Sequence, residues 1–130
     1  MGRLKYPGRA VLIPFFIALL IFLADGPAFA AEPLTISAKN AGSYVGRTVK
    51  VRGKVFEVAR SRNAIFINFG KDWRRDFTAV IFKGNFNDFE AAGINPMNYK
   101  GRTIVISGVV QKYKGRPEII VMTPAQIKAD

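Results

Sequence analysis

The chain of 130 residues contains no cysteine and no histidine. Without cysteine there is no disulfide framework and no thiol nucleophile. Without either residue type, the usual protein ligands of zinc and copper and the commonest general base are also missing. These absences disfavour most hydrolytic mechanisms, and we predict a protein that is not an enzyme, with no catalytic residue, no metal site and no cofactor.

Acidic residues are scarce as well. The chain has 20 Lys and Arg against 9 Asp and Glu, which gives a formal net charge of +11 at pH 7. Such an excess on a small protein favours polyanionic partners, namely nucleic acid, anionic lipid headgroups or acidic glycans. The charge alone does not choose among them.

The first thirty residues have the pattern of a secretory signal peptide. Three cations precede an apolar run over 10–24, then Asp25-Gly26-Pro27 breaks any helix, and Ala28-Phe29-Ala30 is a small-x-small cleavage site. The alternative is a retained N-terminal membrane anchor, but the run is shorter than the ~20 apolar residues that a spanning helix needs. We therefore expect cleavage after Ala30 and export of the remainder to the periplasm or the medium.

The chain after Ala30 has one hundred residues, enough for one domain with one core. Three of the cations and one of the acidic residues lie in the first thirty, so this part carries about nine excess positive charges. We expect a lead-in segment over 31–43 and a domain over 44–130. It has no amphipathic helix of useful length, so we expect no membrane insertion after cleavage.

Strands are predicted by two-residue alternation. Valines alternate with cations over 49–55, where Gly53 suggests a bulge or a sharp coil. A second strand is expected over 64–69, with Phe66 and Asn68 facing out. A third strand is expected over 77–82. Both of its alternating sets of residues are apolar, so the sequence does not show which set faces the core.

A short helix is expected over 85–93, with Asn87 as its N-cap and Gly93 just past its end. After it, residues 101–110 repeat residues 46–55 at a constant offset of 55 positions. A single repetition is not a solenoid, so the two segments should be equivalent strands of one domain.

The last two strands are expected to form a hairpin around residues 113–121. Gly115-Arg116-Pro117 reads as the reversal, because Gly allows positive φ and Pro lacks a donor. The hairpin tip would then carry Lys112, Tyr113, Lys114 and Arg116 together.

Three strands, a short helix and two strands is the order of the five-stranded Greek-key oligonucleotide/oligosaccharide-binding (OB) barrel, an all-β fold. The sequence also resembles a bacterial family of exported OB-fold proteins, of nuclease-associated, nucleic-acid-binding type. The resemblance is carried by four segments of the chain after Ala30: 46–55, 66–72, 77–82, and 113–121 with Pro124-Ala125-Gln126-Ile127. It implies an OB fold and nucleic-acid binding, and it leaves room for a separate nuclease as a partner.

In OB folds the ligand lies across the second and third strands, between the loops that join strands one and two and strands four and five. Cations there can follow phosphates, and exposed rings can stack on bases. The candidate nucleic-acid-binding residues are Arg60, Arg62, Phe66, Asn68, Lys71, Trp73, Arg74, Arg75, Lys112, Tyr113, Lys114 and Arg116.

Single-stranded DNA or RNA, bound with little sequence preference, is thus the expected ligand. Two alternatives remain open. One is a periplasmic OB module that binds a protein or an acidic glycan. The other is a metal-assisted nuclease, suggested by Asp72 and Asp76 beside Arg74 and Arg75, although these carboxylates can equally serve their arginine neighbours.

Overall fold

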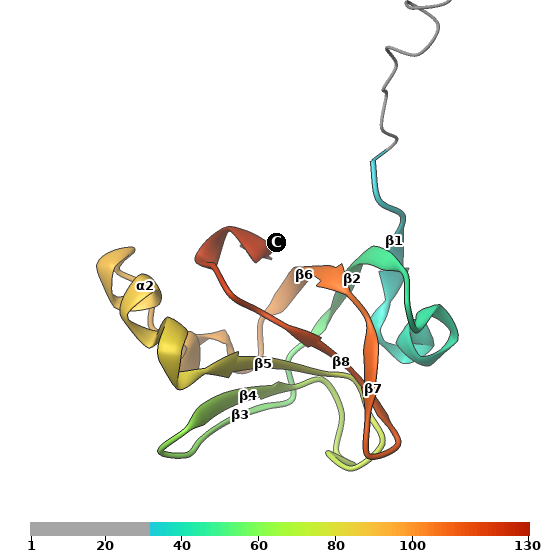
Figure 1. Cartoon of the computed structure of the whole chain (residues 1–130), viewed down its shortest axis with the longest axis horizontal. Coiled ribbons are helices and arrows are strands. Elements are labelled where there is room, and N and C mark those ends of the chain that lie inside the picture. Colours follow the sequence, from blue (N-terminus) through green and yellow to red (C-terminus); the bar gives the residue numbers. More distant parts are fainter. Residues whose placement is uncertain (1–31) are drawn as a thin grey trace, which may run out of the picture. The chain divides into compact units, whose positions relative to one another are not determined.

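The computed structural model describes residues 32–130, so the predicted signal peptide lies outside the described residues. Residues Pro33–Asp130 form one compact unit built on two β-sheets (Figure 1). The first sheet has the order β1-β2-β6-β9, with the bounds Thr35–Ser37, Thr48–Lys54, Thr103–Val109 and Ile127–Ala129. The second has the order β3-β4-β5-β8-β7, with the bounds Glu57–Arg60, Ala64–Asn68, Thr78–Phe82, Arg116–Ile120 and Gln111–Tyr113.

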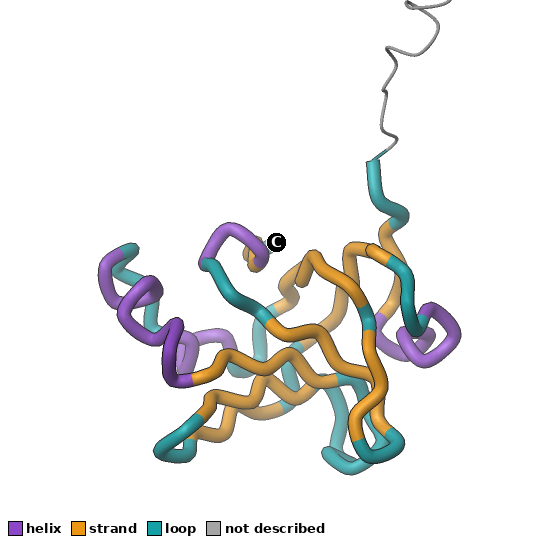
Figure 2. The backbone as a smooth tube through the Cα atoms, viewed as in Figure 1, coloured by secondary structure: helices purple, strands orange, loops and turns teal. Residues whose placement is uncertain are grey.

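The helical segments lie outside the strands, α2 on one side and η2 on the other (Figure 2). They are η2, η3, α2, η4 and η5, with the bounds Ala38–Tyr44, Lys83–Asn85, Phe86–Ala91, Pro96–Tyr99 and Pro124–Gln126. Among residues 32–130, no helix has the length and apolarity that crossing a membrane requires.

This arrangement is an OB fold, as predicted. The predicted first strand runs through β2 and continues after Val55-Phe56 as β3, so it passes from one sheet to the other. The predicted fourth strand does the same through β6 and β7, and β5 pairs in parallel with β8. The strands are shared between two sheets that do not close into one continuous ladder.

Gly53 and Gly108 lie within β2 and β6 where other parts of the chain approach closely. A Cβ on Gly53 would come within 2.9 Å of the Ala38 Cβ and 3.0 Å of the Phe69 ring, and a Cβ on Gly108 within 2.7 Å of Ile119 Cγ2. The two glycines are 55 positions apart, so they occupy the same place in the two copies of the repeat.

The two copies of the repeat pair with each other. Strands β2 and β6 are antiparallel neighbours, with Thr48 opposite Val109. The amide of Gly46 donates to the Val110 carbonyl (2.7 Å), and the equivalent amide of Gly101 donates to the Val55 carbonyl (2.9 Å). These matching bonds show that the repeated segments are related by a local twofold axis.

The core lies between the sheets, where alternate strand residues point inward. Its fully buried aliphatic side chains are Val49, Val51, Val55, Ile65, Ile67, Ile81, Ile104, Ile106, Val110, Ile119 and Val121. Ala79 also belongs to this core, which settles the register of β5 and turns Val80 to the outer face. Phe66 is half-buried on the outer face as expected, but Asn68 is only 9% exposed there.

The short helix is present, although its start differs from the prediction. Asn85 is the N-cap of α2 and makes no side-chain cap bond, so Asn87 lies inside the helix. Gly93 follows the helix with φ of 73°, and its amide donates to the Glu90 carbonyl (2.9 Å). Phe89 is 2% exposed and belongs to the core, so the helix packs against it with this side chain.

The hairpin of β7 and β8 is present, but its reversal lies one residue earlier than predicted. Tyr113 pairs with Arg116, which makes Lys114-Gly115 the two-residue turn. Both turn residues have positive φ, 48° and 87°, as a type I′ turn requires. Arg116 is therefore a strand residue with 7% exposure, and its predicted place at the exposed tip is wrong.

The segment expected as a lead-in contributes to the fold. β1 pairs in parallel with β2, with Ile36 opposite Val51. Ile36 and Ala41 are buried in the core. The compact unit therefore begins before residue 44.

Candidate functional site

A groove of about 840 Å³ crosses the outer face of the five-stranded sheet. The register places Ala59, Phe66, Val80 and Ile120 in one row across β3, β4, β5 and β8. All four line the groove. Side chains that are opposite one another share a face of a sheet, so this row forms an apolar floor.

Three exposed aromatic rings border this floor. Trp73 is 53% exposed on the loop between β4 and β5, Tyr113 is 49% exposed at the end of β7, and Phe82 is 46% exposed at the end of β5. Exposed rings beside an apolar floor offer flat surfaces on which planar ligands can stack.

Arg116 contacts the rings of Phe66 and Tyr113 and the backbone of Trp73. Its guanidinium carbon lies 5.8 Å from the centre of the Phe66 ring and 5.8 Å from the centre of the Tyr113 ring. Nη1 donates to the Trp73 carbonyl (3.0 Å), and Nη2 donates to Glu118 Oε2 (3.3 Å). The buried Nε has no partner among the described residues. Arg116 thus connects the hairpin, the sheet and the Trp73 loop.

Polar groups also lie on the floor, in the row beside the apolar one. This row brings Asn68, Thr78 and Glu118 side by side on β4, β5 and β8. The Thr78 hydroxyl donates to Asn68 Oδ1 (3.0 Å), while Glu118 accepts from Arg116. Asn68 and Glu118 line the groove and so present polar groups beside the stacking surfaces.

The loop over residues 70–76 is shaped by its own carboxylates. Asp76 Oδ2 accepts from the Asp72 amide (3.0 Å), and Asp72 Oδ1 accepts from the Arg74 amide (3.1 Å). A Cβ on Gly70 would collide with the Asp76 carboxylate, so the loop needs glycine there. These bonds use the two carboxylates to fix the backbone that carries Trp73.

Seven of the twelve predicted binding residues line the groove: Phe66, Asn68, Trp73, Lys112, Tyr113, Lys114 and Arg116. Arg74 stacks on Trp73, with its guanidinium carbon 4.7 Å from the ring centre, and lines a smaller pocket beside the groove. Arg62 and Lys71 are exposed and do not line the groove. Arg75 lines a different hollow.

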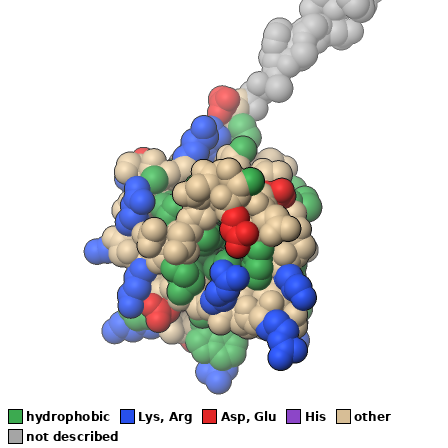
Figure 3. Space-filling model, turned by 90° about the vertical axis from the view of Figure 1, so that its left-hand side faces the viewer, with side chains coloured by type: hydrophobic (Ala, Val, Ile, Leu, Met, Phe, Trp, Pro, Cys, Tyr) green, Lys and Arg blue, Asp and Glu red, His purple; other side chains and the backbone are tan. Residues whose placement is uncertain are grey.

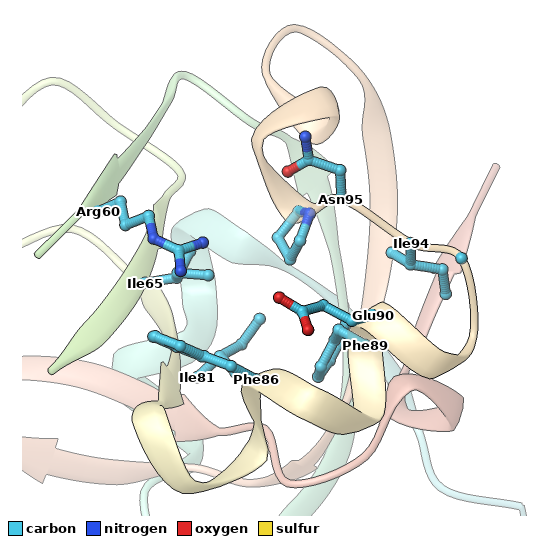
Figure 4. A pocket seen from close by; sticks show the side chains of 10 residues that line it. Arg60, Ile65, Ile81, Phe86, Phe89, Glu90, Ile94 and Asn95 are labelled. Atoms are coloured by element: carbon cyan, nitrogen blue, oxygen red, sulfur yellow. The ribbon is translucent and has the colours of Figure 1, made fainter. Parts of the chain in front are cut away.

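Arg60 lies on the other side of the sheet. It is opposite Ile65, an inward position, so its side chain reaches toward α2 and its guanidinium carbon lies 4.7 Å above the Phe86 ring. There it borders a second hollow of about 380 Å³, into which Arg60 and Glu90 point from opposite walls (Figure 4). The structure therefore does not bring Arg60 to the groove.

Cations elsewhere are dispersed. On the face that carries α2, Lys and Arg side chains are spread from one edge to the other rather than gathered at one place (Figure 3). On the four-stranded sheet, Arg52 is paired with Asp130. The groove is thus distinguished by its rings and its apolar floor more than by a local excess of charge.

Sequence reasoning missed the other groove residues, namely Glu57, Ala59, Val80, Phe82, Gln111, Glu118 and Ile120. For Val80 and Phe82 the signal was absent, because β5 is apolar on both faces. For Glu118 a signal existed: a carboxylate two residues after Arg116 in a strand shares its face. The assignment of Arg116 to the turn hid this relation.

Comparison with solved structures supports the fold. The aspartyl-tRNA synthetase from Entamoeba histolytica is 17% identical, with 79% of this chain and 22% of that chain covered and a TM-score of 0.54. A protein proposed to be an aspartyl-tRNA synthetase from Leishmania major Friedlin is 13% identical, with 86% and 26% covered and a TM-score of 0.52. This chain spans about a quarter of the length of either protein, and at these identities the likeness shows the fold alone.

No protein-family model matches the chain, and no curated protein matches it. The two sheets, the groove and the structural neighbours together define the class: this is an OB-fold protein with an open, ring-bordered groove on the face of its five-stranded sheet.

Proposed function

We propose that this protein is an exported, non-catalytic OB-fold domain that binds single-stranded nucleic acid in the groove. The observation that carries the proposal is that Phe66, Trp73 and Tyr113 line one groove together with Lys112 and Lys114. Bases can stack on the rings, a contact worth ~1 to 3 kcal/mol each, while the rim cations follow the phosphates. The structural neighbours are named as tRNA synthetases, which agrees with a nucleic-acid ligand.

Single strands fit this site better than duplexes. Bases in a duplex are paired and stacked on each other, so their faces are not free to stack on protein rings. The apolar floor also favours unpaired bases, because a duplex presents its charged backbone outward. We expect little sequence discrimination, because every base has a stacking face.

Fluorescence anisotropy with labelled oligonucleotides tests this proposal. Tyr113→Ala and Trp73→Ala should each weaken binding of single-stranded DNA by about 5- to 150-fold, the equivalent of one stacking contact. Phe56→Ala is the matched control, because Phe56 is also 49% exposed but does not line the groove. Equal losses on single strands and on duplex of the same sequence would contradict stacking.

Salt dependence separates nucleic acid from a stacked glycan. A protein that contacts several phosphates loses affinity by orders of magnitude between 50 and 200 mM salt, since each contact releases counterions. A binder that stacks uncharged sugar rings would keep most of its affinity over this range, so an acidic polysaccharide is compared with DNA directly. The screen should include single-stranded DNA, RNA, duplex and an acidic polysaccharide.

The absence of catalysis is part of the proposal and has its own assay. Single-stranded DNA is incubated with the protein and calcium or magnesium, and the expected result is intact DNA. Metal-dependent cleavage that is lost in Asp72→Asn would instead favour the nuclease alternative.

Export is tested by the N-terminus of the accumulated protein. If residues 1–30 are a cleaved signal, N-terminal sequencing of protein recovered outside the cytoplasm should begin at Ala31. A protein that keeps residues 1–30 and sediments with membranes would favour the anchor.

A further inference from the structure

A small pocket lies between the tip of the β7–β8 hairpin and the loop over residues 70–76, which run side by side (Figure 1). Its volume is about 220 Å³, and it is lined by Trp73, Arg74, Tyr113, Lys114 and Arg116. All of these except Arg74 also line the groove. The pocket therefore adjoins the groove at the β7 edge of the sheet.

The lining of this pocket is cationic and aromatic, with no carboxylate. Arg74 lies over the Trp73 ring at 4.7 Å, and the ammonium nitrogen of Lys114 lies 5.3 Å from the centre of the Tyr113 ring. The nearby Asp72 accepts from the backbone amide of Arg74 and is used inside its own loop. The cations are thus held at the rings and not drawn away by acidic side chains.

The charge in the pocket amounts to two uncompensated cations. Arg116 is neutralised by its ion pair with Glu118, whereas Arg74 and Lys114 form no ion pair within the described residues. A phosphate monoester carries about −1.5 to −2 at pH 7, while a phosphodiester carries one negative charge. The pocket therefore matches a monoester better than an internal phosphodiester.

The volume of the pocket also favours a terminal phosphate group as its ligand. Pockets that enclose a drug-sized ligand measure about 300–1,000 Å³, and this pocket is smaller. It can take a phosphate with part of its sugar, while the adjoining groove has room for the bases. We infer that the pocket binds the terminal phosphate of a nucleic-acid strand, so that the protein prefers phosphorylated strand ends. This inference rests on the proposed function of the groove.

The test compares three single-stranded oligonucleotides of one sequence, with a 5′-phosphate, with a 3′-phosphate and with neither. One phosphorylated form should bind about tenfold more tightly than the unphosphorylated form, the size expected for one charge-assisted contact. Arg74→Gln should remove this gain, so that the phosphorylated and unphosphorylated strands bind with equal affinity, because Arg74 lines the pocket.

Arg47→Gln is the matched control. The Arg47 guanidinium carbon also stacks on an aromatic ring, 5.2 Å from the centre of Tyr44, but away from the pocket. Arg47→Gln removes one positive charge and one contact between a guanidinium and an aromatic ring, as Arg74→Gln does. The gain from the terminal phosphate should survive this substitution.

The pH dependence gives a second readout. The second pKa of a phosphate monoester is about 6, so the gain should shrink as the pH falls from 7.5 to 5. The chain has no histidine, the side chain whose ordinary pKa lies in this range, so the change reports the ligand. A gain that stays constant over this range would overturn the inference.

The remaining outcomes separate this inference from the proposed function. No binding of any oligonucleotide would refute both. Tight binding without a gain from either terminal phosphate would overturn the inference alone. A gain that persists in Arg74→Gln, or that Arg47→Gln removes equally, would show that the pocket is not its source.

Discussion

Arg116 and Glu118 form an ion pair on the floor of the groove, with 3.3 Å between Nη2 and Oε2 and side chains that are only 9% and 7% exposed. They are two residues apart on β8, so they share the outer face of the sheet. The pair keeps a buried guanidinium group whose carbon lies 5.8 Å from the centre of the Phe66 ring and 5.8 Å from the centre of the Tyr113 ring. The position of the rings that form the stacking surface therefore depends on the buried ion pair of Arg116 with Glu118.

Removal of one member of this pair should be costly. Arg116→Ala leaves the Glu118 carboxylate buried without its partner, so we expect a loss of ~3 to 5 kcal/mol in the free energy of unfolding. Urea denaturation measures it. Arg52→Ala breaks the exposed pair with Asp130, whose side chains are 54% and 42% exposed, and should cost less than ~1 kcal/mol. Equal small losses would show that the buried pair is unimportant for stability.

The glycines of the two bent strands should not tolerate a side chain. Gly108→Ala places a Cβ 2.7 Å from Ile119 Cγ2, and Gly53→Ala places one 2.9 Å from the Ala38 Cβ. Overpacking of this kind typically costs ~1 to 3 kcal/mol. Gly84→Ala is the control, because nothing lies within 4 Å of its added Cβ. Thermal denaturation should rank both strand variants well below Gly84→Ala.

The hairpin turn offers a variant in which stability and binding change in opposite directions. Lys114 has φ of 48°, a conformation that favours Asn-Gly in a type I′ turn. Lys114→Asn should stabilise the domain by up to ~1 kcal/mol, or roughly 4–8 °C in melting temperature. The same change removes a rim cation and should weaken oligonucleotide binding.

Lys112→Gln is the comparison for that variant. Lys112 lines the groove from β7, outside the turn, so its loss should weaken binding without raising the melting temperature. Weaker binding that is accompanied by unfolding in Lys114→Asn would contradict the turn assignment.

Alkaline stability should report on Tyr99. Burial raises the pKa of the Tyr99 phenol above its ordinary value of 10.0, and the charge of Arg102 opposes this shift. A pKa that is raised in the folded state stabilises the fold below the unfolded value, and this contribution is lost as the pH rises through the folded value. Tyr99→Phe should therefore lose less stability than the wild type between pH 10 and pH 12.

Tyr44→Phe is the matched control, because Tyr44 occupies the equivalent place one repeat earlier and is only half-buried. Denaturant titrations at pH 8, 10 and 12 give the comparison. Identical pH profiles for Tyr99→Phe and the wild type would contradict the prediction.

Local patterns sufficed for most of the fold. Alternating valines and cations predicted β2, and the repeat at a fixed offset predicted the equivalent strand β6. The turn was displaced because Pro117 was taken as part of the reversal, whereas it lies opposite Lys112 in the β7–β8 ladder, just before the pairing of β8 with β5 begins at Glu118. A proline at the start of a shared strand loses little there.

The groove was harder to predict because it depends on which face each strand presents. Phe66 was assigned correctly from alternation, but Arg60 was placed beside it without regard to its register opposite Ile65. Arg116 donates to the carbonyl of Trp73, 43 residues away, and this contact connects the Trp73 loop to the floor of the groove. Such long-range contacts leave no local pattern.

The pairing of the two repeat copies has one more consequence. Gly46 and Gly101 bond across β2 and β6 in the same way, so each copy pairs with a segment that is identical to it at five of ten positions. A fragment that contained only one copy would have an unpaired strand edge. A second molecule of the same fragment could pair with this edge in an isologous dimer. Within the intact chain, the two copies pair with each other as β2 and β6, so neither of these paired edges is left open to a second molecule.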